Sequence, residues 1–255
     1  MNDITMNVTE KPKLKDAILI EGLPGIGLVG KLAADHLLDE VDAKKMAELY
    51  SHNLPPQVMI QDDGTVKLVN MEFYYHKTKK NHLVFLVGDF QGITPESQYR
   101  LTDEIIAYAK KIGVRRVYTL GGLGTGNLTK TPRVFGAATN HDLVKEHEKY
   151  DIIFKGGGAI LGASGLLLGI GMQHGIEGVC LMGETHGQII DAKSAEAVLE
   201  VLTKILNLKI DNRALVEKAK DTEEQMMKIS QMISANQQAQ EQQKKFLSES
   251  PSYIR

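Results

Sequence analysis

Three glycines in the sequence have the spacing of a nucleotide-binding loop. Gly25, Gly27 and Gly30 form a GxGxxG pattern between an apolar run at 17–22 and a helical pattern at 28–40. In that setting the backbone N–H groups that open the helix can bind a pyrophosphate. The interpretation that we favour is a glycine turn that lets the helix pack closely on the sheet.

In dinucleotide-binding folds, an acidic residue about 20 positions after the GxGxxG pattern binds a ribose hydroxyl, and an acidic residue stands at about that spacing here. It is Glu48, within the segment AELYSHNLPPQ, which does not predict a convincing second strand. Gly22 and Pro24 further lengthen the turn before the GxGxxG pattern. Both observations weigh against a dinucleotide site.

A second glycine cluster, Gly122, Gly124 and Gly126, follows the predicted strand RRVYTL. Its backbone amides could form a concave anion site, although the lysine of a GxxxxGK[ST] phosphate loop is absent. The alternative is a flexible or sharply turned loop. Because α/β proteins bind ligands at the C-terminal ends of strands, a small ligand remains the minor interpretation.

The sequence predicts no catalytic or metal-binding set. Ser164 lacks the second glycine of a GxSxG turn, because Leu166 takes that place. His186, after Glu184, is the best isolated acid–base candidate, but a loop histidine more often binds backbone. Cys180 lies in GVCLM and is predicted to be a buried apolar residue. We therefore expect no metal, no cofactor and no enzyme activity.

Composition narrows the possible partners. The 255 residues carry a net charge of −2 and only 5% aromatic residues, which argues against nucleic acid as a partner. No run of 18 apolar residues exists, so we expect no membrane span. The N-terminus lacks the apolar core of a signal peptide, and we expect a soluble, cytoplasmic protein.

Short apolar runs alternate with helical patterns up to about residue 208, which predicts an α/β fold with a layered, mostly parallel sheet. Thr94 and Pro95 are typical of a helix start. We predict a globular domain at 1–208, a long C-terminal helix at 209–248 and a flexible tail at 249–255.

The predicted C-terminal helix has a narrow apolar stripe. Its seam includes Leu215, Met226, Ile229 and Ile233. Such a helix is not stable alone, so we expect it to pack on a neighbouring subunit and then project as an arm. The alternative is a helix that lies back on its own domain.

Several motifs in order resemble one family. They are Gly22-Leu23-Pro24-Gly25-Ile26-Gly27-Leu28-Val29-Gly30, His52-Asn53-Leu54-Pro55-Pro56, Gly121–Gly126, Gly162-Ala163-Ser164-Gly165-Leu166 and Gly183-Glu184-Thr185. Through roughly residues 15–208 the chain resembles the archaeal proteasome assembly chaperones, similar to chaperone subunit two. The resemblance implies a phosphorylase/hydrolase-like α/β fold without established catalysis, and homo-oligomers with helical C-terminal extensions that assemble or bind the 20S proteasome.

The resemblance also directs attention to the last residues. Some relatives dock between proteasome α subunits through a C-terminal hydrophobic–Tyr–any-residue motif. Here the chain ends Tyr253-Ile254-Arg255, so the tyrosine is displaced by one position. These three residues are our candidate partner-binding residues.

Our leading hypothesis is a non-enzymatic homo-oligomeric chaperone or adaptor. Its partners would be further copies of itself, and 20S proteasome α subunits or a paralogous chaperone. The rival hypothesis is a nucleotide- or phosphate-binding enzyme that uses the two glycine clusters. A third is a purely structural oligomer with no link to the proteasome.

Overall fold

The computed structural model describes residues 3–127, 129–154 and 156–217. Its strands are β1 (Ile4–Val8), β2 (Ala17–Gly22), β3 (Lys44–Ser51), β4 (Val58–Ile60), β5 (Val66–Leu68), β6 (Met71–Lys77), β7 (His82–Gly88), β8 (Val114–Gly124), β9 (Val134–Ala138) and β10 (Glu177–Thr185). Its helices are α1 (Val29–Glu40), α2 (Pro95–Lys111), α3 (His141–His147), α4 (Ala163–Gln173) and α5 (Ala192–Leu206), with short 3-10 turns η1 (Ile26–Leu28) and η2 (Glu148–Tyr150).

Eight of these strands form one mixed sheet, in the order β1-β3-β6-β7-β2-β8-β10-β9. The four central strands β7, β2, β8 and β10 run parallel to one another. Antiparallel pairs flank them, and β3 runs in the same direction as the centre. The predicted α/β fold is confirmed, and β4 and β5 form a separate hairpin.

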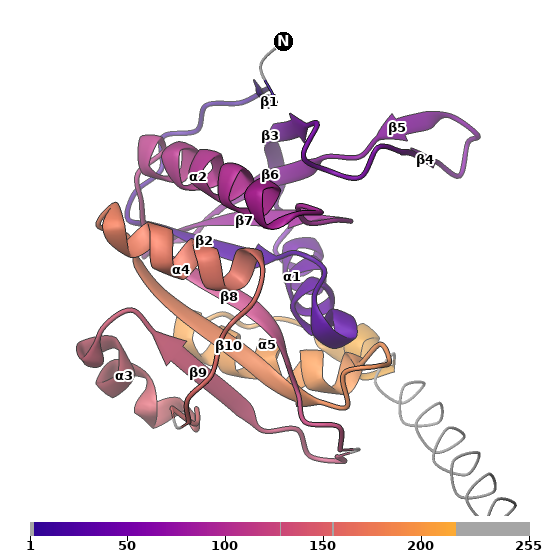
Figure 1. The fold of residues 1–255 in the computed structure, drawn as a ribbon. Helices are drawn as coiled ribbons and strands as arrows, with labels where there is room; N and C mark the ends of the chain where they lie inside the picture. The colour runs from indigo at the N-terminus through magenta and orange to yellow at the C-terminus, as the bar shows by residue number, and fades with distance from the viewer. Residues whose placement is uncertain (1–2, 128, 155, 218–255) are drawn as a thin grey trace, which may run out of the picture.

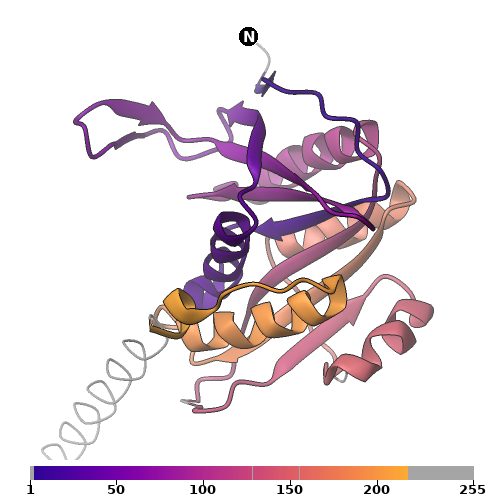
Figure 2. The ribbon, with the colours of Figure 1, turned by 180° about the vertical axis from the view of Figure 1, so that it is seen from behind.

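Helices cover both faces of the sheet, as Figures 1 and 2 show from opposite sides. Helices α2 and α4 pack together on one face, over a core that includes Phe73 and Ile105. Helices α1 and α5 pack together on the other, over a core that includes Phe85 and Leu199. The apolar runs of β2 and β7 are buried because both of their faces meet a helical layer.

Local signals set several boundaries. The Thr94 side chain accepts a hydrogen bond from the backbone N–H of Ser97, whose hydroxyl is bonded to the Thr94 backbone in return. This reciprocal pair, with Pro95 at the first helical position, starts α2 where the sequence predicts. The Asn140 side chain caps α3 in a similar way, by accepting from the N–H of Leu143.

One expectation about strands is corrected. The segment around Glu48 is a strand, β3, although its sequence did not predict one. A bulge between Lys45 and Ala47 interrupts the alternation of buried residues.

Candidate functional site

The GxGxxG loop and the turn before it pack directly against neighbouring backbone and side chains, so no space is left at two of their glycines. A Cβ atom at Gly30 would lie 2.0 Å from the carbonyl oxygen of Leu120, and one at Gly22 would lie 2.1 Å from the Cβ of Ala34. Glycine is therefore required for α1 to approach β2 and β8. This close contact supports the packing interpretation of the motif.

Gly27 and Gly25 complete the same loop in different ways. Gly27 adopts φ 63°, and its carbonyl accepts a hydrogen bond of 2.8 Å from the Asp191 N–H, at the start of α5. Gly25 is extended and has open space around it. The loop is thus tied to the segment between β10 and α5.

The second glycine cluster packs against the first. A Cβ at Gly122 would lie 2.4 Å from the carbonyl oxygen of Ile26. The Thr125 N–H donates to the Thr185 carbonyl at 2.9 Å, which joins the end of β8 to the end of β10. Gly124 and Gly126 have more room, and Gly126 adopts φ 73°. The structure thus brings the two predicted ligand loops together, but as contact surfaces for each other.

Glu48 lies away from these loops. It is on β3, which β6 and β7 separate from β2 in the sheet. Its carboxylate accepts hydrogen bonds of 3.1 Å from Lys45 and from the Tyr50 hydroxyl. The acid of the proposed dinucleotide pattern therefore binds neighbouring side chains on its own strand.

A buried carboxylic acid, Glu21, lies at the end of β2 among these loops. Its Oε1 accepts a 2.9 Å hydrogen bond from the Leu23 N–H, and its Oε2 accepts one of 2.9 Å from the Ser164 hydroxyl. Burial raises the pKa of Glu21 to about 7, against the opposing effect of these hydrogen bonds. The acid ties β2 to the first turn of α4.

The Gln91 amide binds the same loops from the segment after β7. Its Oε1 accepts from the Ala163 N–H at 3.0 Å and its Nε2 donates to the Pro24 carbonyl at 2.6 Å. Gln98 donates to the same Oε1 at 3.1 Å. We did not predict this network. Glu21 stands inside an apolar run, and glutamine in a loop carries no signal of its partners.

The carboxylate of Glu184, at the end of β10, is paired with an arginine. Both oxygens of Glu184 accept 2.8 Å hydrogen bonds from Arg133, which lower the pKa of the carboxyl. Glu184 is thus held ionised beside its partner.

Cys180, within β10, is buried as predicted, and burial raises the pKa of its thiol to about 12.

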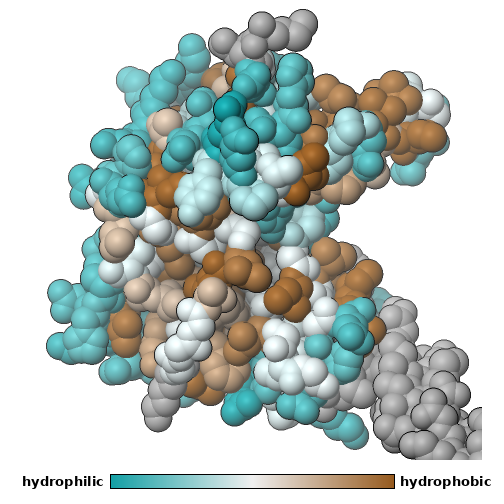
Figure 3. All heavy atoms as spheres, in the orientation of Figure 1, coloured by the Kyte–Doolittle hydropathy of each residue, from teal (hydrophilic) through white to brown (hydrophobic). Residues whose placement is uncertain are grey.

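Exposed apolar side chains gather where the central strands end. Among the described residues, eight of the ten large apolar side chains that are exposed belong to segments at this edge. Figure 3 shows apolar groups on the projecting hairpin and on the body below it. We call the first group the hairpin face (Val58, Ile60, Val66, Leu68) and the second the edge surface (Ile26, Ile93, Leu161, Ile190).

The sequence around the hairpin carries a local signal for its two strands and its turn. Val58-Met59-Ile60 and Val66-Lys67-Leu68 flank a polar turn with an Asp63-Gly64 pair. Short β-prone runs around Asp-Gly are typical of a hairpin. Exposure of the apolar residues could not be inferred, because alternation alone does not say which face is covered.

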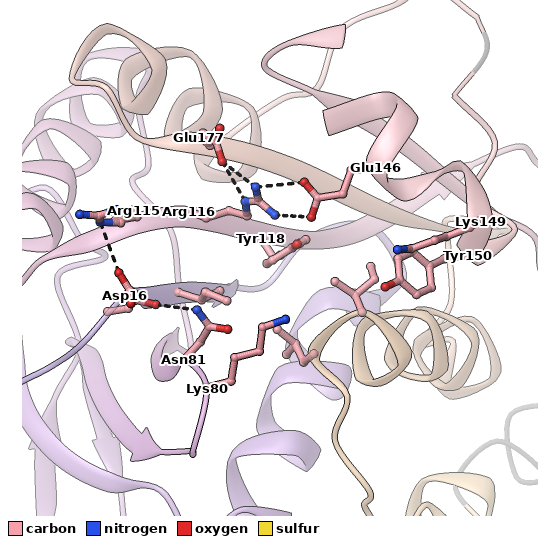
Figure 4. A pocket seen from close by; sticks show the side chains of 14 residues that line it. Asp16, Lys80, Asn81, Arg115, Arg116, Tyr118, Glu146, Lys149, Tyr150 and Glu177 are labelled. Atoms are coloured by element: carbon pink, nitrogen blue, oxygen red, sulfur yellow. Dashed lines mark hydrogen bonds and ion pairs between the residues drawn. The ribbon is translucent and has the colours of Figure 1, made fainter. Parts of the chain in front are cut away.

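A hollow of about 390 Å³ lies at the opposite edge, where β2, β8 and β10 begin (Figure 4). Arg116 donates to Glu146 at 2.8 and 3.2 Å and to Glu177 at 2.6 Å. These carboxylates neutralise the guanidinium, so Arg116 ties β8 to α3 and β10. In the figure Lys80 and Lys149 extend toward the hollow from different sides.

The beginning of the predicted arm is described, and the rest is not. Leu215 is 1% exposed in the α1–α5 core of its own chain, within a helical stretch at 213–217. The backbone of Asp211, just before it, is bonded to the Glu40 carboxylate and to the His36 ring. Met226, Ile229, Ile233 and the tail residues Tyr253, Ile254 and Arg255 lie outside the described residues, so the seam and the tail site stay predictions.

Metal ligands and membrane spans are both missing from the part of the chain that the structure describes. Within it, no three or more His, Cys, Asp or Glu residues are grouped so as to hold a metal ion. Over the same residues, no helix has the length and apolar character needed to cross a bilayer.

Comparison with known proteins identifies the family. The model of the PAC2 family matches residues 19–230, and the chain therefore belongs to the PAC2 family. It is 43% identical over 239 residues to the uncharacterized protein MJ1210 of Methanocaldococcus jannaschii, covering 89% of this chain and 92% of that protein.

Solved structures from Pyrococcus furiosus are similar throughout. PbaB, an archaeal proteasome activator, is 43% identical with a TM-score of 0.86, over 90% of this chain and all of that one. The monoclinic form of PbaA, an archaeal homologue of proteasome-assembly chaperone, is 29% identical with a TM-score of 0.76, over 99% of this chain and all of that one. The predicted resemblance to archaeal proteasome assembly chaperones is confirmed.

Proposed function

We propose that this protein is a non-enzymatic, homo-oligomeric adaptor that binds the 20S proteasome through its C-terminal segment. The observation that carries the proposal is the likeness to PbaB, a proteasome activator, at 43% identity over the whole of that chain. A surface that recognises a large partner is constrained by that partner, so a likeness at this level supports a partner of the same kind.

The geometry of the loops supports a binding role over a catalytic one. The two glycine clusters fill each other's space, and of the two acids beside them Glu21 is buried and Glu184 is paired with Arg133. Exposed aliphatic side chains surround them instead. Such surfaces are typical of protein–protein contact.

The proposal assigns binding to two parts of the C-terminal segment. The seam residues Met226, Ile229 and Ile233 would order the arm, and Tyr253 would anchor the tail in a pocket of the proteasome. Several arms on one oligomer would act together, because a first contact raises the effective concentration of the others.

The test uses the full chain and archaeal 20S proteasome, with binding measured by surface plasmon resonance. We expect the unmodified chain to bind, and Tyr253→Ala to weaken binding by about tenfold or more, the loss of one aromatic anchor. Tyr99→Ala is the matched control, because Tyr99 is exposed on α2. Equal binding by the chain and by a form lacking residues 253–255 would contradict the tail's role, and no binding by the unmodified chain would contradict the proposed function.

A further inference from the structure

The β4–β5 hairpin holds an apolar face away from the body of the protein. Val58 pairs with Leu68 and Ile60 with Val66, so these four side chains share one side of the ribbon. Ile60 is 78% exposed. In Figures 1 and 2 the hairpin projects from the sheet. All four side chains of the hairpin face are exposed in the described part of the chain.

Contacts on the other side of the hairpin fix its position. Met59 is partly buried against the core beneath α2. Lys67 forms an ion pair with Glu72 on β6. Burial acts to raise the pKa of Glu72, but hydrogen bonds from Lys45 and Lys67 outweigh it and help to lower that pKa to about 2. The hairpin is thus anchored through one side while its aliphatic side faces solvent. A two-stranded ribbon is marginal in water, so a partner on the free side would stabilise it.

The edge surface offers an apolar area of matching character on the same chain. Its four members extend from different loops, and Leu161 is 80% exposed. Ile26 lies against Gly124, where the loop that carries Lys130 begins. The edge surface therefore continues into a segment with an exposed positive charge.

The charges favour a second copy of this chain as the occupant. Asp62 and Asp63 stand at the exposed tip of the hairpin. Lys130 is exposed in the loop between Gly124 and Arg133, and both ends of that loop contact the end of β10. A hairpin laid on the edge surface of another copy would bring carboxylates toward this ammonium group. Aliphatic surfaces with opposite charges at their rim are typical of permanent assemblies.

We propose that the hairpin face of one copy docks on the edge surface of the next, with the acidic tip toward Lys130. The proposal rests on the homo-oligomer of the proposed function and names the surface that builds it. The two surfaces differ, so the contact is head-to-tail, and repetition of it closes into a ring when the rotation permits.

Native mass spectrometry of the full chain tests the contact. We expect Ile60→Asp combined with Val66→Asp to convert the oligomer to monomer, because two carboxylates would be buried without partners. Met172→Asp is the matched control: Met172 is 54% exposed at the far end of α4, and its change should leave the oligomer intact. Circular dichroism should be the same for all variants. An oligomer that persists in the double variant would overturn the proposal.

Disulfide trapping tests the direction of the contact. The native Cys180 is fully buried, so introduced cysteines react alone. A chain that carries both Asp62→Cys and Lys130→Cys should, on oxidation, form covalent species larger than a dimer. An oxidised mixture of the two single variants, Asp62→Cys and Lys130→Cys, should form covalent dimers only. Crosslinking of Asp62→Cys with itself would show hairpins meeting each other and would overturn the head-to-tail arrangement.

Binding to the proteasome separates this inference from the proposed function. Monomeric hairpin variants should still bind, with weaker apparent affinity because the arms act singly. If the variants are monomeric and the unmodified oligomer binds no proteasome, the proposed function is wrong and the docking surface stands. If the hairpin variants remain oligomeric but lose proteasome binding, the occupant is the proteasome and our assignment of a second copy is wrong.

Discussion

The β2–α1 loop and the β4–β5 hairpin lie at the same edge of the sheet, and their surroundings are opposite. The loop carries a motif that suggests phosphate chemistry, yet Gly22 and Gly30 at its ends pack directly on α1 and β8. The hairpin carries no ligand-binding motif, yet it presents aliphatic side chains to solvent. In this protein, the pattern associated with ligands serves packing, and a segment without such a pattern offers an apolar surface.

A substitution inside the loop gives the largest expected effect. Gly30→Ala should destabilise the fold by about 3 kcal/mol or more, because the added methyl group would overlap the Leu120 carbonyl. Helix propensity alone would favour alanine here by about 1 kcal/mol. Urea unfolding followed by circular dichroism measures the difference.

Gly25→Ala is the control within the same motif. Gly25 is extended with open space around it, so the change should be neutral or stabilising by less than about 1 kcal/mol. Equal effects of the two substitutions would contradict the packing interpretation.

The buried acid predicts a smaller, pH-dependent effect. Burial raises the pKa of Glu21 to about 7 in the folded chain, from an ordinary value of 4.5. The folded chain therefore binds this proton more tightly than the unfolded chain, and stability should fall as pH rises between these values, by on the order of 3 kcal/mol at most. Glu21→Gln should remove this dependence and be more stable than the unmodified chain at pH 8.

Ser164→Ala sharpens the same measurement. Its hydroxyl lowers the pKa of Glu21 by donating to the carboxylate, so its loss should extend the pH-dependent range upward. If the unfolding free energies of the unmodified chain and of Glu21→Gln change in parallel from pH 5 to 8, the pKa of Glu21 is not raised in the folded chain and the prediction is wrong.

The smallest expected effect concerns ligands. A panel of nucleotides at about millimolar concentration should shift the Tm by less than about 1 °C, because a ligand stabilises a protein only by binding its folded state. A concentration-dependent rise with any of them would revive the nucleotide-binding alternative, and Gly122→Ala would then show whether the loops are involved.

The sequence predicted the elements that depend on local signals. The buried run of β2 and the Thr94 cap of α2 are each recognisable within a few residues of sequence. It missed β3, where a bulge disturbs the alternation, and β9, which is short and contains Gly136. The GxGxxG pattern was recognised, but only distances in the fold show that packing requires Gly30.

The candidate site was less predictable because its parts come from distant segments. Glu21 meets Ser164 across 143 positions, and Gln91 meets Ala163 across 72. Nothing near either residue in the sequence indicates the partner. The exposure of the hairpin face likewise depends on where β3 and β6 place the connecting segment.

Hydrogen–deuterium exchange of the full chain tests the contrast between loop and hairpin most directly. We expect amides at 58–60, 66–68 and 186–191 to exchange more slowly at micromolar than at nanomolar concentration, as copies cover the hairpin face and the edge surface. Amides at 29–31 should exchange equally at both concentrations, because packing of Gly30 on β8 within one chain closes that part of the loop. Unchanged exchange in the hairpin, with protection of 29–31 only on adding a nucleotide, would contradict both halves of the contrast.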